Sequence, residues 1–200
     1  SQVAFSADAS LLRTVNDGSA IRLWDVQPGP PVGTLLRPAG PLRSVALSPD
    51  MKLLATVGSD DSVRLWDSPT GQARGRALLH RATINRVRFS PDSRRLLTAS
   101  SDGSARLWDV DNGQSLGEPL PHGDAVTDAL CSPDGRWIAT ASQDGRVRLW
   151  DGQSGQPLGR ALPHPASLNR LAFSPVGGQW ATASFNYPVR LWNVQAPPIL

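Results

Sequence analysis

Histidine, aspartate and serine side chains recur along this chain of 200 residues in a combination that can support nucleophilic catalysis. The three histidines are spaced by 42 residues: His80, His122 and His164. Asp102 and Asp144 keep the same interval, and Ser100 and Ser142 precede them by two residues. A hydroxyl, an imidazole and a carboxylate make up the catalytic triad of many hydrolases. Because an enzyme needs its triad once and this set repeats, we interpret these residues as structural.

The repeat that carries these residues extends over the whole chain. The tetrapeptide Arg-Leu-Trp-Asp, with Asn in place of Asp in its last copy, closes each repeat at Asp25, Asp67, Asp109, Asp151 and Asn193. A period of about 40–45 residues that ends on Trp-Asp is typical of a four-stranded propeller blade. The sequence therefore predicts an all-β fold, a β-propeller of four-stranded antiparallel blades. We expect about five blades over residues 1–200, with the last one lacking its outer strand, as part of a larger propeller.

Within each repeat, short apolar runs separated by turn residues predict four strands, named a to d from the propeller axis outward. The strands expected in the third repeat cover 85–89, 96–100, 105–109 and 115–120, and those in the fourth cover 127–131, 137–142, 147–151 and 157–162. Pro119 and Pro157 fall in the outer strand d, where a missing amide donor costs least. The outer strand of the first repeat is expected over 32–36.

These Trp-Asp repeats resemble the WD-repeat β-propeller family, and the resemblance covers essentially the whole chain. In that family a His before strand a, a Ser or Thr on strand b, an Asp in the b–c turn and the Trp of strand c share a buried hydrogen-bond network. The resemblance implies two such networks here: His80, Ser100, Asp102 and Trp108 in the third repeat, and His122, Ser142, Asp144 and Trp150 in the fourth. Thr98 and Thr140 lie on the same face as alternative hydroxyls.

Two repeats depart from this pattern. Pro38 stands where the second repeat would have its His, and Asn186 replaces the Asp of the fifth. A partly satisfied buried polar network is costly, so we expect these two blades to be held less tightly.

The resemblance also implies a function, because WD-repeat propellers are mostly rigid platforms that bind peptides or protein partners and perform no chemistry. We expect a non-enzymatic interaction scaffold without a cofactor, forming the repeat region of a larger signalling or regulatory protein. The near-identical repeats with Leu-Pro-His connectors are similar to bacterial arrays fused to kinase, protease-like or nucleotide-hydrolysing domains. Ring closure would need further blades in the parent chain or a second copy.

Two positions in each repeat are candidates for the rim where partners bind in this family. One follows the apolar residue that starts strand a, and the other directly precedes the b–c turn. These positions are Arg43, Asn85, Thr127 and Asn169, and Ser59, Ser101, Gln143 and Phe185. They vary between repeats while their neighbours do not, as a partner-binding surface or an unconstrained loop would allow. Arg43 and Phe185 are the strongest candidates, since Arg and aromatic residues are enriched at binding hot spots.

Other function classes receive little support from the sequence. The net charge of +3 comes from scattered arginines, so nucleic-acid binding is not indicated. There is no Cys-x-x-Cys or His-Glu-x-x-His spacing for a metal and no Gly-rich phosphate loop. Cys131 occupies an apolar column and is predicted to be a buried thiol, not a nucleophile. A ligand-binding or enzymatic propeller and a nucleic-acid-binding propeller stay open as alternatives.

No apolar run approaches the roughly 18 residues that a membrane-spanning helix needs, and no signal peptide is visible. The single cysteine cannot form an intrachain disulfide. The missing signal does not decide the compartment, and a cytoplasmic location is our expectation.

Overall fold

The computed structural model describes residues 2–5, 11–15, 21–25, 41–175 and 178–193. The first three segments form one sheet of β1 (Gln2–Phe5), β2 (Leu11–Val15) and β3 (Ile21–Asp25), in that order. The expected outer strand over 32–36, the Pro38 position and residues 194–200, where an outer strand of the fifth blade would follow, lie outside the described residues.

The other four sheets follow one another along the chain, each with its strands in sequence order. The second contains β4 (Leu42–Leu47), β5 (Leu53–Gly58), β6 (Ser62–Asp67) and β7 (Ala73–Leu79). The third contains β8 (Ile84–Phe89), β9 (Arg95–Ser100), β10 (Ser104–Asp109) and β11 (Leu120–Pro121). The fourth contains β12 (Val126–Cys131), β13 (Trp137–Ser142), β14 (Arg146–Asp151) and β15 (Leu162–Pro163). The fifth contains β16 (Leu168–Phe173), β17 (Gln179–Ser184) and β18 (Arg190–Asn193).

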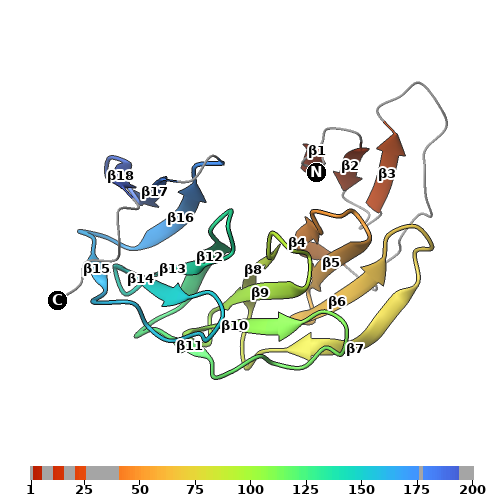
Figure 1. Cartoon of the computed structure of the whole chain (residues 1–200), viewed down its shortest axis with the longest axis horizontal. Helices are drawn as coiled ribbons and strands as arrows, with labels where there is room; N and C mark the ends of the chain where they lie inside the picture. Colours follow the sequence, from red (N-terminus) through yellow and green to blue (C-terminus); the bar gives the residue numbers. More distant parts are fainter. Residues whose placement is uncertain (1, 6–10, 16–20, 26–40, 176–177, 194–200) are drawn as a thin grey trace.

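The five sheets are propeller blades arranged in an open arc (Figure 1). All strand pairs are antiparallel, and the described residues form no helix. The first strands β4, β8, β12 and β16 lie next to one another along the inner side of the arc. The predicted all-β fold of propeller blades is therefore confirmed, and the arc is not closed into a ring.

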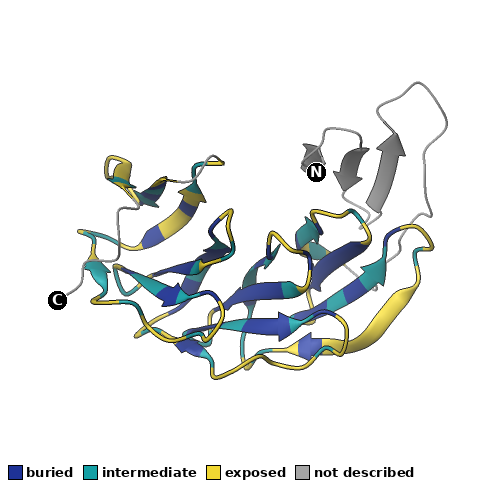
Figure 2. Cartoon of the chain, viewed as in Figure 1, coloured by how far each residue is buried: buried dark blue, intermediate teal, exposed yellow. Residues whose placement is uncertain are grey.

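Apolar side chains between successive blades form the core. Leu65 on β6 packs with Ile84 and Trp108 of the next blade, and Leu107 on β10 packs in the same way with Val126 and Trp150. Buried residues occupy the middle strands, whereas β7 and the loops are exposed (Figure 2). Because both faces of an inner blade are covered, these strands carry apolar residues on both sides.

No described residue covers the face of the fifth sheet on the open side of the arc in this way. Leu191 on β18 occupies the column of Leu65 and Leu107, which are 3% and 6% exposed. Leu191 itself is 73% exposed. An apolar column that is core between the inner blades is therefore surface at this end.

The outer strands of the third and fourth blades are shorter than predicted. Strand d was expected over 115–120 and 157–162, but β11 and β15 have two residues each, and one isolated bridge precedes each of them. The matching strand β7 spans seven residues and has alanine at both positions where these repeats carry Pro119 and Pro157. Its pairing with β6 also shifts register, between Val63 and Leu65, so the ladder of strand d is interrupted in a blade without these prolines too. Proline alone therefore does not account for the shorter β11 and β15.

A β-bulge follows the first residue of the innermost strand in each of the last four blades. The strand register shifts between Leu42 and Ser44, and the same shift recurs in β8, β12 and β16. The residue that each shift skips is Arg43, Asn85, Thr127 or Asn169. A bulge leaves its extra residue out of the ladder and re-aims the side chain. Local backbone geometry thus singles out the four positions predicted for the rim at the start of strand a.

Candidate functional site

In the third blade the imidazole of His80 lies between a threonine and an aspartate. Its Nδ1 is 2.9 Å from Asp102 Oδ2, and its Nε2 is 2.7 Å from Thr98 Oγ1. The indole Nε1 of Trp108 donates to the same Thr98 oxygen over 2.9 Å. The His80 side chain is fully buried, and that of Asp102 is 7% exposed. Four side chains from the d–a connection, strand b, the b–c turn and strand c are thus joined.

The donor inventory of these groups assigns one direction to the network. An indole N–H only donates, so Thr98 accepts from Trp108 and has its own hydroxyl hydrogen for His80 Nε2. Nδ1 of a neutral His80 then donates to the Asp102 carboxylate, which only accepts. Burial lowers the pKa of His80 although Asp102 opposes this, consistent with a neutral imidazole.

Asp102 collects further donors that hold the b–c turn. It accepts hydrogen bonds from the Arg81 amide and from both the amide and the hydroxyl of Ser104. Burial raises the pKa of this carboxyl, but the bonds from Ser104 and His80 and the Arg81 amide outweigh it and lower the pKa to about 2. Asp102 therefore remains ionised as the acceptor at the end of the network.

The hydroxyl expected in this network was Ser100, and that expectation is wrong. Thr98 makes the bonds to His80 and Trp108, while Ser100 accepts from the Asp102 amide and donates to the carbonyl of Ala82 or Thr83. The fourth blade repeats the correction, since Thr140 bonds the histidine and the tryptophan there. Ser142 bonds the Asp124 carbonyl and the Asp144 amide instead. Strand alternation places 98 and 100 on one face. In the register of β9 with β10, Trp108 pairs with Leu96, so Thr98 is two residues from that partner and Ser100 is four, and the indole reaches Thr98.

The fourth blade repeats the network of the third blade, since His122 Nδ1 lies 3.2 Å from Asp144 Oδ2. The network is weaker in the second and fifth blades, which depart from the sequence pattern. In the fifth, His164 keeps its bond to Thr182, but Nδ1 turns to the Leu162 carbonyl at 3.3 Å because Asn186 offers no carboxylate. In the second, Trp66 bonds Thr56, and Asp60 pairs with Arg64.

The predicted rim residues fall into two groups. Thr127, Gln143, Asn169 and Phe185 line one hollow of about 620 Å³ between the fourth and fifth blades, together with Tyr187. The remaining four lie on the second and third blades: Arg43, Ser59, Asn85 and Ser101. The first group thus shares one concave surface.

Two of the bulge residues also connect blades. Asn85 Nδ2 donates to the Val126 carbonyl over 2.8 Å, and Thr127 Oγ1 donates to the Leu168 carbonyl over 2.7 Å. Asn85 also contacts Ser101 within its own blade. Arg43 makes no hydrogen bond to a neighbouring blade within the described residues. Its Nη1 lies 3.7 Å from Oδ1 of Asp61, in the b–c turn of the same blade. The interpretation of Asn85 and Thr127 as unconstrained loop residues therefore fails.

Tyr187 was not among the predicted rim residues. It is 48% exposed and lines the hollow beside Phe185, which is 67% exposed. It stands in the column that holds Gly103 and Gly145, and it is the only tyrosine of the chain. An aromatic residue unique to one repeat at a glycine position is the signal that could have identified it.

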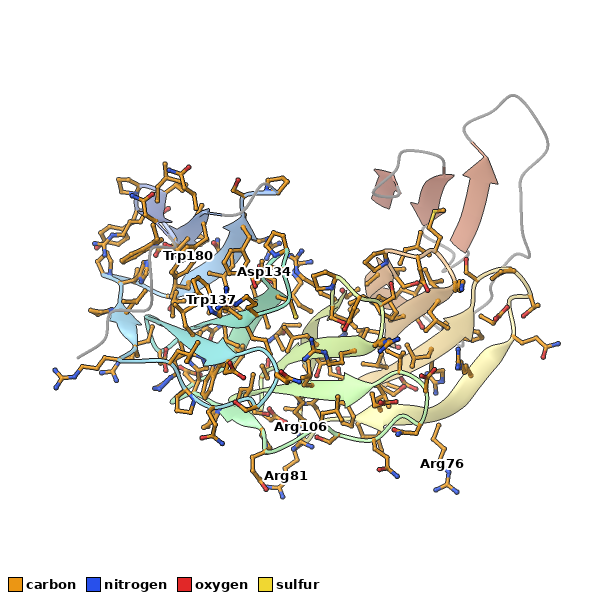
Figure 3. All side chains as sticks on the ribbon, in the orientation of Figure 1. Arg76, Arg81, Arg106, Asp134, Trp137 and Trp180 are labelled. Carbon is orange, nitrogen blue, oxygen red and sulfur yellow. The ribbon has the colours of Figure 1, made fainter. Side chains whose placement is uncertain are left out.

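A second hollow of about 660 Å³ lies at the opposite ends of the strands, between the third and fourth blades. Its lining includes Asp134 and Trp137, which are labelled in Figure 3, and Arg95. Arg95 already donates to the Gly152 carbonyl and lies 3.9 Å from Asp92. The carboxylates of this hollow accept hydrogen bonds mainly within their own turns, as Asp134 does from Ser132 and Asp151 does from Ser154.

The described residues contain no group of three or more His, Cys, Asp or Glu side chains placed to hold a metal ion. Within the same residues no helix has the length and apolar character to span a membrane. The thiol of Cys131 packs beside the core between the third and fourth blades, and burial raises its pKa to about 11.

A family model described as "WD domain, G-beta repeat" matches residues 29–67, 77–109 and 113–151. No curated protein matches the sequence. Each matched segment ends on the Trp-Asp pair that closes strand c, and together the three segments cover more than half of the chain. With its open arc of four-stranded blades and its tryptophan–threonine hydrogen bonds, the chain belongs to the WD-repeat family.

Proposed function

We propose that this chain is a non-enzymatic scaffold that binds a peptide segment of a partner protein in the hollow between the fourth and fifth blades. The observation that carries the proposal is the convergence of Thr127, Gln143, Asn169 and Phe185 on that one hollow. They come from two blades and from positions that vary between repeats. WD-repeat domains are protein-interaction scaffolds in general, which supports the same function class.

The chemistry of the hollow suits an extended peptide. Phe185 and Tyr187 offer exposed aromatic surface for one apolar side chain of the partner. Gln143 and Asn169 are exposed amides that both donate and accept, as the backbone of a bound peptide requires. A hollow of about 620 Å³ holds a few residues of a peptide, not a whole domain.

We infer that another blade covers the open face of the fifth sheet in the assembled protein, supplied by further blades or a second copy. Leu65 and Leu107 are buried by the blade that follows theirs, and Leu191 presents the same column uncovered. If sedimentation showed this chain to be monomeric at all concentrations with a cooperative melting transition, this inference would be wrong.

The same proposal assigns the chain to a bacterial signalling or regulatory protein of the cytoplasm. Its support is the near-identity of the repeats and their Leu-Pro-His connectors. The domains encoded beside these repeats in the full-length gene test this assignment.

The binding proposal is tested by selecting peptides from a displayed random library against the chain and measuring their affinity for variants. Phe185→Ala should weaken a selected peptide by more than about 1 kcal/mol, as expected of a hot-spot residue. Arg43→Ala should do the same only for a peptide that extends from this hollow along the rim to the second blade. Arg74→Ala and Arg160→Ala at the outer edge are matched controls and should change affinity little. Equal losses in rim and outer-edge variants would place the interface on the side of the blades and overturn the proposal.

A further inference from the structure

Charged side chains gather on the inner strands of three successive blades. Arg86 and Arg88 lie on β8, Asp128 lies on β12 and Arg170 lies on β16. Both β8 and β16 are direct neighbours of β12 along the inner side of the arc. Ser44 occupies the column of Arg86, Asp128 and Arg170 in the second blade, so the cluster is not a feature of every repeat.

Asp128 is the negative centre of this cluster and is fully buried. Its carboxylate accepts hydrogen bonds from the amides of Ala129 and Leu171, each over 3.0 Å. Arg88 Nη2 lies 3.3 and 3.4 Å from the two carboxylate oxygens. One arginine thus balances the buried aspartate, as a buried charge requires.

Arg86 and Arg170 carry positive charge that no carboxylate in the described part of the chain pairs with. Arg170 Nη1 donates only to the adjacent Asn169 carbonyl, and Arg86 has no hydrogen bond to a described residue. Burial lowers the pKa of Arg86, and the charges of Arg170 and Arg88 lower it further against the attraction of Asp128. Two guanidinium groups from blades on either side of β12 therefore repel each other.

We propose that Arg86 and Arg170 bind a carboxylate side chain of an acidic peptide at the inner strands. This inference rests on the proposed peptide-binding function and specifies the partner's chemistry. Thr127 and Asn169 line the rim hollow, and Asp128 and Arg170 are the next residues along β12 and β16. The cluster therefore adjoins the hollow along these two strands. The planar fork of a guanidinium matches a carboxylate with two parallel hydrogen bonds.

An acidic peptide fits this cluster better than a nucleic acid does. Nucleic-acid binding depends on many cations that neutralise successive phosphates. Here only two arginines are unpaired, and the Asp128 carboxylate between their strands would repel a continuous row of phosphates. A single glutamate or aspartate places one negative charge between two positive ones.

The test measures fluorescence anisotropy of a labelled hexaglutamate peptide with the full chain, beside hexaglutamine and a short oligothymidylate. Hexaglutamate should bind, and hexaglutamine should not. Arg86→Gln and Arg170→Gln should each weaken hexaglutamate binding about tenfold, whereas Arg86→Lys should weaken it less than Arg86→Gln, because lysine keeps the charge without the fork. Arg76→Gln is the control, since Arg76 projects from the outer strand β7 away from the other blades (Figure 3). Thermal melting should show all variants folded, because Arg86 holds no hydrogen bond in the described structure.

Three results would overturn the inference. These are no binding of hexaglutamate, an equal loss in Arg76→Gln, or oligothymidylate binding with the same dependence on Arg86 and Arg170. None of them touches the rim proposal, because library peptides selected without regard to charge test that separately through Phe185. The converse result is also possible. If hexaglutamate binds the Phe185→Ala variant unchanged and no library peptide binds the chain, the arginine site is retained and the rim hollow is rejected.

Discussion

Trp108 Nε1 donates a hydrogen bond to Thr98 Oγ1 over 2.9 Å, across two neighbouring strands of one blade. The same indole-to-threonine bond recurs in the second, fourth and fifth blades at 2.8, 2.8 and 3.0 Å. It is present with or without an aspartate bound to the histidine. The tryptophan–threonine pair is therefore the constant part of the blade, and the histidine and aspartate are added to it where the sequence supplies them.

The first prediction separates Thr98 from Ser100. Thr98→Val keeps the shape of the side chain but leaves the Trp108 indole N–H and His80 Nε2 without their partner. We expect the indole proton of Trp108 to shift and to exchange faster in an NMR spectrum of this variant. Ser100→Ala is the matched control and should leave that proton unchanged, although it also removes a buried hydroxyl. A larger shift in Ser100→Ala would return Ser100 to the network.

Asp102→Ala should destabilise the third blade strongly. The change leaves His80 Nδ1, the Arg81 amide and the two Ser104 donors without an acceptor, at a cost on the order of 1–3 kcal/mol in free energy of unfolding. Asp92→Ala also removes a turn carboxylate, but that side chain is 49% exposed, so water replaces its bonds and the loss should be clearly smaller. Denaturant unfolding of both variants provides the comparison, and equal losses would contradict a structural role for the network.

Stability should fall as the pH is lowered, in two windows. Burial lowers the pKa of His80 and of His122 in the folded chain, whereas in the unfolded chain they bind protons near the usual 6.5. The unfolded state therefore takes up protons first, and the free energy of unfolding decreases as the pH falls below about 6.5. Asp102, with a pKa of about 2, adds a second loss between about pH 4 and pH 2.

Denaturant titrations at a series of pH values measure both windows. The double variant His80→Asn with His122→Asn should reduce the first window to the part that His164, whose pKa burial also lowers, contributes, and it should leave the second in place. An unfolding free energy that rises as the pH falls from neutral would contradict buried neutral histidines.

Cys131 should be unreactive in the folded chain. Burial raises its thiol pKa to about 11, so little thiolate exists near neutral pH, and the thiolate is the reactive form. Alkylation by iodoacetamide, followed by mass spectrometry, should be slow in buffer and fast in denaturant. Rapid modification of the native chain would indicate that the column of Cys131 opens to solvent.

The sequence by itself determined the repeating blade, because a fixed spacing of tryptophan and aspartate reports one local strand–turn–strand unit copied along the chain. It also marked Arg43 and Asn169 as candidate rim positions, because their column varies between repeats, whereas the bulge at each of them is visible only in the strand pairing. Only the tertiary structure decided which hydroxyl completes the network. Thr98 and Ser100 share a face and a polarity, and only the register of β9 with β10 shows that Thr98 is the one within reach of the Trp108 indole.

Contacts between blades were likewise beyond the sequence. That Asn85 bonds the Val126 carbonyl, that Leu171 donates to Asp128, and that Arg86 and Arg170 lie on the two strands flanking β12 depend on how neighbouring blades dock. Local strand patterns carry no information about that geometry, because the same residues would suit a solvent-exposed face. Each repeat specifies its own hydrogen-bonded ladder, whereas the charges and surfaces that meet between repeats are set only when the blades pack.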